Sequence, residues 1–393
     1  MDDDRRLIAE VGEVISVPRA APADSFVLHA PLELLARAGL LPLVRPDARA
    51  VARERVRGLA AEYLAAGDPV EPPARIDVDS VEDGAARLVA AIEAGDLDDV
   101  DRLASWVGDH VTATELRQRL AQPVAASLAA AAHASILLYL LTRVPLAVDV
   151  SSTIVRGPAR ELARNPEWRL RWFDDPDGII AINGTLADAL LEVPMLGLPG
   201  NNFIFPIMNQ AEESGVAAKL LAGVIDGDAE SAGRDLARIA ALSMLQESPD
   251  HSPYGWSHCL TMPQAVIALA GHGSEPRTAI AVAATHVVGF RAALGERSLD
   301  AGYEPAPPTT PDLAHAIATS QDEAAAVVWH APVDALDEIV TELATRAALH
   351  SDAHLVKYTL ACFDAADADP PNRRLFLAAA ASLSAWWSQF PDA

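Results

Sequence analysis

The segment His350-Ser-Asp-Ala-His354-Leu-Val-Lys357 places two imidazoles beside one of only two lysines in a chain of 393 residues. Lysine and arginine together number 30, so 28 of the basic residues are arginines. A buried amine, unlike a guanidinium, can lose its proton and react with a carbonyl or with CO2. On a helix, positions 350, 354 and 357 line one face, which predicts a metal-binding edge. Alternatively, Lys357 snorkels from a core helix and the arginine bias reflects base composition.

Further histidines lie in apolar sequence: His29, His133, His258 and His286. A buried neutral imidazole has one donor and one acceptor to satisfy, and these segments offer few polar partners. Coordination to one metal ion would satisfy several rings at once, with carbonyls or carboxylates binding the second nitrogen of each. Nitrogen-rich, thiolate-free ligation suits Fe, Zn, Cu or Ni. The alternative for each ring is an ordinary hydrogen-bonded core histidine.

Several other chemistries lack their motifs. The sequence has no Gly-x-Gly-x-x-Gly, no phosphate-binding Gly-x-x-x-x-Gly-Lys, no Gly-x-Ser-x-Gly and no His-Glu-x-x-His. No histidine has a glutamate three positions before it, which argues against a helical di-iron carboxylate centre. Asp312-Leu-Ala-His315 is the nearest fragment, and we expect it at a helix start on the surface. Only Cys259 and Cys362 are present, which suits a reducing cytosol.

The formal net charge of −25 argues against nucleic acid and anionic membranes as partners, and favours a small uncharged or aromatic ligand. The start of the chain has no apolar core typical of a secretory signal. Residues 123–142 carry no charge and are long enough to span a bilayer. Because the first half is Ala and Ser and His133 lies inside it, we expect a buried central helix, with a lone membrane anchor as the alternative. The expected location is the cytoplasm.

Alanine-rich segments with apolar residues at intervals of three and four predict a mostly helical protein. We expect an all-α fold: one large multi-helix domain over 25–393 with a buried metal and substrate cavity, preceded by an N-terminal tail at 1–24. The predicted helices span 28–39, 51–64, 81–94, 96–106, 112–142, 184–191, 210–223, 228–246, 263–271, 276–294, 311–328, 332–348, 350–366 and 371–388.

Residues 193–208 are apolar and aromatic but interrupted by Pro and Gly, so we expect no regular helix there. Such a loop lines a substrate cavity or forms a lid, packs in the core, or makes a subunit contact. Exposure of this loop would favour a homodimer.

With these elements in order, the chain resembles the questin oxidase-like family. The likeness lies in four stretches that together span most of the chain: 28–39, the Ala-rich segment that leads to His133-Ala-Ser-Ile136, His258-Cys-Leu-Thr261, and Asp352-Ala-His-Leu-Val-Lys-Tyr-Thr359. The chain departs from the family pattern after His133, where Leu137-Leu-Tyr-Leu-Leu replaces a more polar continuation, and around 193–208. These differences bear on the substrate more than on the metal.

The resemblance implies an all-helical oxygenase that acts on aromatic polyketide-type compounds, by oxidative C–C cleavage or by Baeyer–Villiger-like oxygen insertion. It also implies a non-heme iron centre held by histidines and by a lysine carboxylated on its amine. The hypothesis for this chain is Fe(II), or another divalent metal, bound by His29, His133, His258, His354 and the carbamate of Lys357. O2 and an aromatic small molecule are the co-substrates, and a separate reductase is a candidate electron source.

The remaining candidates surround that centre. Catalytic or reserve roles fall to His350 and His286, and substrate contacts to Trp256, Phe203, Phe205 and His330. Two other classes stay open: a metal-dependent hydrolase or lyase that uses the same residues to generate hydroxide, and a non-catalytic small-molecule-binding protein that needs no metal.

Overall fold

Alanine-rich amphipathic segments form the long elements of this chain, because alanine has the highest helix propensity and the apolar positions recur on one face. The computed structural model describes residues 2–20, 25–145, 153–174, 184–200, 204–225 and 227–390. Over these ranges the fold is all-α, as predicted, and extended pairing is confined to isolated bridges.

The helices lie close to the predicted ranges in most of the chain. Their bounds are α1 Asp2–Ile15, α2 Ser25–Leu40, α3 Arg49–Ala65, α4 Val81–Ala94, α5 Leu97–His110, α6 Ala113–Ala125, α7 His133–Arg143, α8 Arg156–Arg164, α9 Leu186–Leu191, α10 Ile204–Glu213, α11 Val216–Leu221, α12 Ala229–Gln246, α13 Ser257–Ile267, α14 Pro276–Leu294, α15 Leu313–Thr319, α16 Gln321–His330, α17 Leu336–Leu349, α18 Ala353–Ala368 and α19 Arg373–Gln389.

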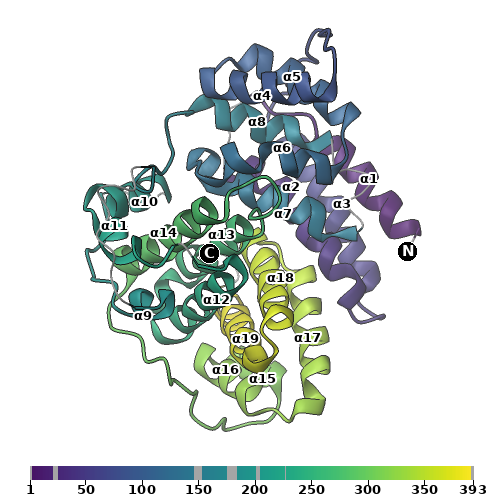
Figure 1. Cartoon of the computed structure of the whole chain (residues 1–393). Coiled ribbons are helices and arrows are strands. Elements are labelled where there is room, and N and C mark those ends of the chain that lie inside the picture. Colours follow the sequence, from purple (N-terminus) through teal and green to yellow (C-terminus); the bar gives the residue numbers. More distant parts are fainter. Residues whose placement is uncertain are drawn as a thin grey trace.

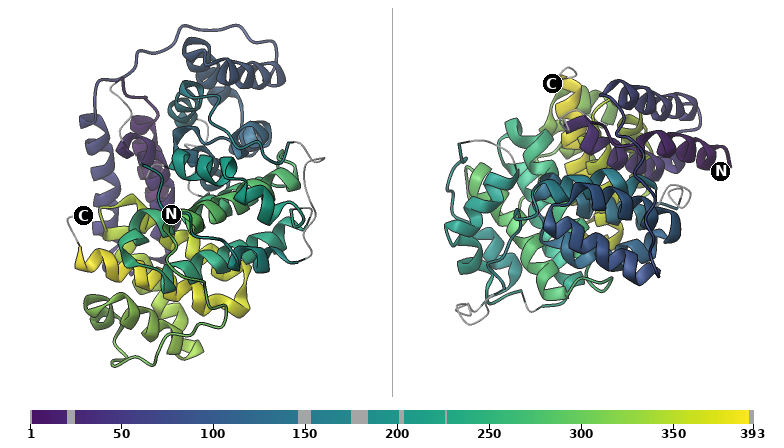
Figure 2. Two further views of the ribbon diagram at one scale, coloured as in Figure 1. Left: turned by 90° about the vertical axis from the view of Figure 1, so that its left-hand side faces the viewer. Right: turned by 90° about the horizontal axis from the view of Figure 1, so that it is seen from above.

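The first eight helices form the upper half of the molecule and the C-terminal helices form the lower half (Figure 1). A view turned by a right angle shows the same division (Figure 2). Four helices join the halves in a closed ring, since α2 packs on α7, α7 on α13, α13 on α18, and α18 on α2. This ring comes from segments far apart in the sequence, and it carries the histidines predicted to bind metal.

The expected N-terminal tail is a helix. Residues 2–15 form α1, whose buried side chains Leu7, Ile8, Val11 and Ile15 pack against α3 and α2. The apolar side of α1 loses contact with water in this way, which stabilises it despite the acidic start of the chain.

The predicted single helix over 112–142 is divided. Helix α6 ends at Ala125, a short 3-10 turn with left-handed backbone spans Ala129–Ala132 (η2), and α7 begins at His133. Backbone hydrogen bonds to a distant strand-like segment explain the break, because the N–H of Leu128 donates to the carbonyl of Trp168 and the N–H of Leu170 donates to that of Ala126. The uncharged stretch is therefore no continuous helix. Among the residues described, no helix combines the length and apolar character needed to cross a bilayer.

Residues 193–208 are only partly irregular. The segment 193–200 has no regular secondary structure, and Met195, Leu196 and Leu198 are exposed in it. Helix α10 begins at Ile204, however, and Pro206 lies in its first turn, where a missing N–H costs no hydrogen bond.

Candidate metal centre

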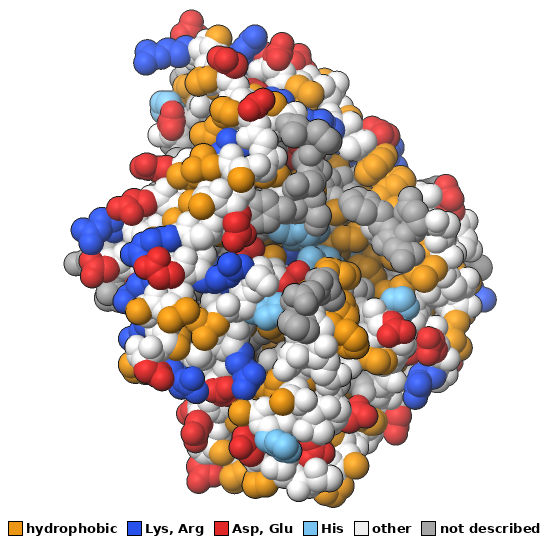
Figure 3. Space-filling model, turned by 180° about the vertical axis from the view of Figure 1, so that it is seen from behind, with side chains coloured by type: hydrophobic (Ala, Val, Ile, Leu, Met, Phe, Trp, Pro, Cys, Tyr) orange, Lys and Arg blue, Asp and Glu red, His pale blue; other side chains and the backbone are white. Residues whose placement is uncertain are grey.

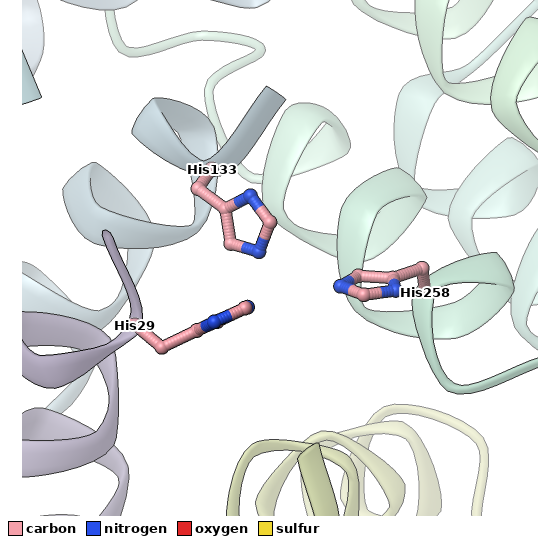
Figure 4. Close-up of side chains that lie close together, drawn as sticks. All are labelled: His29, His133 and His258. Atoms are coloured by element: carbon pink, nitrogen blue, oxygen red, sulfur yellow. The ribbon is translucent and has the colours of Figure 1, made fainter. Parts of the chain in front are cut away.

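Four histidines lie together inside the ring of α2, α7, α13 and α18. Ring centroids are 4.6 Å apart for His29 and His133, 4.6 Å for His29 and His354, 4.9 Å for His258 and His354, and 5.3 Å for His133 and His258. Figure 4 shows three of these rings, from α2, α7 and α13, facing one common space. One nitrogen of each of these three lies within 4.8 Å of the others.

The second nitrogen of three rings is held by an acceptor. Nδ1 of His133 is 3.0 Å from the carbonyl oxygen of Ala130, Nδ1 of His258 contacts the carbonyl of Tyr254, and Nδ1 of His354 is 3.1 Å from a carboxylate oxygen of Asp352. These oxygens only accept, so Nδ1 carries the hydrogen and Nε2 keeps its lone pair. For His133 and His258, Nε2 is buried and has no hydrogen-bond partner within the described part of the chain. This is the arrangement of a metal-ligating histidine with its supporting contact.

Burial favours the uncharged form of all four imidazoles. It is the largest cause that lowers the pKa of His29, His133 and His258 well below the usual value, and it also lowers the pKa of His354. The nearby Lys357 amine lowers the pKa of each ring further. A neutral ring is the form that binds a metal.

Lys357 lies one turn after His354 on α18, on the same face of the helix, and its charge acts on the His354 ring. Its side chain is buried, and its Nζ has no hydrogen-bond partner among the described residues. Burial lowers the pKa of this amine to about 7, although the carboxylates of Asp352 and Glu33 oppose the shift. About half of the amine is therefore uncharged at neutral pH, as a reaction with CO2 requires.

The residues present fit a metal ion. Bonds of about 2.1 Å around one ion place three nitrogen ligands roughly 3.0–3.6 Å apart, so nitrogens that now lie within 4.8 Å of one another need to approach by up to about 1–2 Å. The Nε2 lone pairs of His133 and His258 have no hydrogen-bond partner in the ranges that the structure describes, and the buried Lys357 amine is close enough for its charge to act on both rings. A cation would satisfy these atoms together.

Two of the candidate ligand histidines follow unusual backbone. Ala130, Ala131 and Ala132 adopt φ values of 50°, 51° and 57°, a left-handed turn directly before His133. Each such residue costs roughly 1–2 kcal/mol when it is not glycine. The π-helical turn η7, Ser252–Trp256, comes directly before α13 and supplies the carbonyl that holds His258. Backbone of both kinds is concentrated at functional sites.

A buried ion pair ties α2 to the start of α18. Nε and Nη2 of Arg37 donate to one oxygen of Glu33 at 2.8 and 2.5 Å. The same guanidinium donates to the carbonyls of Ala348 and His350 at 2.7 and 2.6 Å. Burial raises the pKa of Glu33, while the charge and hydrogen bonds of Arg37 oppose that shift. The helix of His29 is thereby fixed to the segment that leads to His354.

We expect Asp352→Asn to weaken metal binding by about 10–100-fold while stability changes little. Asp352 is the N-cap of α18, where its carboxylate accepts the N–H of His354 at 2.6 Å and also holds Nδ1 of that ring. Asparagine keeps the cap acceptor but removes the charge that makes the imidazole more basic. Titration with Zn²⁺ and thermal unfolding of the metal-free protein check this. Equal affinities in the two proteins would contradict the supporting role of Asp352.

His350 does not share the face of His354 and Lys357. The helix begins at Ala353, and His350 lies before it in extended backbone, with φ −72° and ψ 156°. Its Nδ1 accepts the N–H of Asp352 at 3.0 Å, and its ring centroid lies 5.0 Å from that of Trp387. The predicted i, i+4, i+7 pattern therefore reduces to His354 and Lys357, because Asp352 starts the helix two residues after His350.

The other predicted site residues lie elsewhere. His286 is buried on α14, and among the described residues its ring makes no contact with the four histidine rings. Trp256 is fully buried in the core, where its indole N–H donates to the carbonyl of Ser248. Phe205 stacks on Trp168. His330 is exposed, and its Nε2 lies 2.9 Å from the carbonyl of Pro305.

Phe203, the remaining predicted substrate contact, lies outside the described residues. Asp312 caps α15, as expected, by accepting the N–H groups of Ala314 and His315.

We expect the metal-free protein to lose stability as the pH falls from about 6.5 to about 4. Burial lowers the pKa of His286 to about 4, so between these values the unfolded chain binds a proton that the folded chain does not. The stability that His286 contributes is complete above the pKa of its ring in the unfolded chain, about 6.5. It is lost as the pH falls through the pKa of the ring in the folded protein, about 4. This one group accounts for about 3 kcal/mol. Denaturant unfolding across this pH range should show a smaller loss for His286→Met, and identical pH profiles would contradict the assignment.

Three residues near the site escaped the sequence analysis. Tyr254 packs edge-on against His354 with a centroid distance of 4.8 Å, and about half of its surface is exposed. Glu33 and Arg37 follow His29 at spacings of four and eight on one helical face, and this periodicity was the available signal. Figure 3 shows histidine side chains in a hollow near the centre of one face, bordered by hydrophobic side chains.

Fold and site together define a helical protein with a buried four-histidine, one-lysine cluster suited to a metal ion. Comparisons of the chain with protein-family models, with curated proteins and with solved structures found no match.

Proposed function

We propose that this protein is a metal-dependent oxygenase whose metal is held by His29, His133, His258, His354 and carboxylated Lys357. The observation that carries the proposal is the convergence of four uncharged imidazoles and one partly deprotonated amine in one buried cluster. The resemblance to the questin oxidase-like family extends it to Fe(II), O2 and an aromatic polyketide-type substrate.

Each group of the chain has a chemical role in this proposal. The ammonium of Lys357 first releases one proton, and the lone pair of the resulting amine attacks the carbon of CO2. An N–C bond forms, one C=O electron pair moves to oxygen, and a second proton leaves the nitrogen to solvent. With both protons lost, a cation becomes an anionic oxygen ligand, which arginine cannot provide. Asp352 and the carbonyls of Ala130 and Tyr254 hold Nδ1 of three rings, so that Nε2 is available. Apolar walls exclude water from the reaction.

Bound Fe(II) would activate O2 and acidify a substrate hydroxyl. The half-exposed ring of Tyr254 lies beside His354 and is the described aromatic side chain best placed to contact a planar substrate. Trp256 is fully buried in the core and Phe205 stacks on Trp168, so neither ring is as well placed to contact the substrate.

Metal quantification combined with an oxygen electrode tests the proposal. The purified protein should contain one iron per chain, lose it to a chelator, and consume O2 with a hydroxyanthraquinone only after Fe(II) is returned. Native mass spectrometry should show an added CO2 that His258→Ala, without a complete metal site, does not retain. Bound metal with hydrolysis and no O2 uptake would support a hydrolase instead, and failure to bind any divalent metal would overturn the proposal.

A further inference from the structure

The left-handed turn before His133 is unusual because none of its residues is glycine. Elsewhere the chain uses glycine at positive φ, for example at Gly95 and Gly215, where helices end or begin. Alanine carries a Cβ that opposes this conformation at each of three consecutive positions. Local preference therefore does not explain the turn, and the surrounding structure must impose it.

The surroundings do restrain it on both sides. The N–H of Leu128 donates to the carbonyl of Trp168 at 2.7 Å, and the N–H of Leu170 donates to the carbonyl of Ala126 at 3.0 Å. The turn packs against α8 and α10 on one side and continues into α7 on the other. Ala130, Ala131 and Ala132 are all buried, so their methyl groups are part of this packing.

The result of the turn is a fixed imidazole. The Ala130 carbonyl lies 3.0 Å from Nδ1 of His133, which places the hydrogen on Nδ1. Nε2 then faces the cluster, and no described residue hydrogen-bonds to it. His133 is the first residue of α7, so no earlier helical turn orients its side chain. Its position depends on the three alanines before it.

We propose that Ala130–Ala132 form a strained positioning element that fixes both the tautomer and the location of His133 for metal binding. The inference rests on the proposed function only in requiring that the histidine cluster binds a metal. Glycine in this turn would relieve the strain and also let the backbone move, so that stability and metal affinity should change in opposite directions. A purely structural role would move both in the same direction.

Ala131→Gly tests this, with Ala132→Gly as a second variant and Ala265→Gly in the regular helix α13 as the matched control. We expect both turn variants to raise the unfolding temperature of the metal-free protein by about 2 °C and to weaken Co²⁺ binding by about 10-fold or more. NMR of labelled histidine in the metal-free protein should show a mixed tautomer for His133, assigned with His133→Gln. Ala265→Gly should lower the unfolding temperature and leave Co²⁺ affinity unchanged.

The outcomes separate the two proposals. If the parent protein binds no Co²⁺, the proposed function fails, and the tautomer measurement still decides the role of the turn. If the parent binds Co²⁺ and the turn variants keep its affinity and the single tautomer, the positioning role is overturned. Turn variants that unfold at a lower temperature, as Ala265→Gly should, would show that the turn is unstrained and would also overturn it.

Discussion

Replacing Lys357 with arginine is expected to abolish stoichiometric metal binding, whereas Lys219→Arg leaves it intact. The two variants make the same chemical change at the only two lysines of the chain, one buried in the cluster and one exposed on α11. Arginine keeps a permanent positive charge beside the four imidazoles and cannot form a carbamate. The affinity loss should exceed the roughly 10–100-fold that removal of a supporting residue causes.

Metal content per chain and calorimetric titration with Zn²⁺ measure this difference. Native mass spectrometry of both variants adds an independent readout, because only Lys219→Arg should retain the CO2 adduct. Unchanged metal content in Lys357→Arg would remove this amine from the ligand set and leave a centre of histidines alone.

Arg37→Ala is expected to lower the free energy of unfolding by about 3–5 kcal/mol. The change leaves the Glu33 carboxylate buried without its partner, and it leaves the carbonyls of Ala348 and His350 without their donor. Because this contact joins the helix of His29 to the segment before His354, metal affinity should fall as well.

The double variant Glu33→Leu with Arg37→Met separates the two effects. Replacing a buried ion pair by apolar side chains of similar size often restores stability. Urea unfolding of the double variant should therefore show that most of the lost free energy of unfolding is regained. Metal affinity should stay low, because the tie to residues 348–350 is still missing. Recovery of both quantities would show that Arg37 contributes to folding alone.

Local sequence patterns predicted the helices where the local signal and the tertiary structure agree. Helices over 81–94, 228–246 and 276–294 were predicted within a residue or two, since Ser80 and Asp228 cap the first two and Pro276 starts the third. The helix over 311–328 is interrupted because Ser320 ends α15 and caps α16. The break at 126–132 has no local signal, because alanine favours a right-handed helix and hydrogen bonds from residues 168–170 override that preference.

The candidate site shows the same limit. Histidines in apolar sequence indicated His29, His133 and His258, since an imidazole without polar neighbours needs a partner from elsewhere. The same argument also selected His286, because sequence alone does not tell which buried faces meet. The helical spacing to Lys357 indicated His354. The contacts of Asp352 and Arg37 depend on where α18 starts and on which helix it packs against, and neither follows from periodicity.

The ring of α2, α7, α13 and α18 also bears on how the histidine cluster assembles during folding. Its groups come from four helices that are far apart in the sequence, and His29 and Lys357 are separated by 328 positions (357 − 29). Contacts between residues so distant in the chain form slowly, because a long loop must close before they are made. The candidate site is therefore complete only once the whole ring has closed, and it depends on the tertiary fold rather than on any single helix.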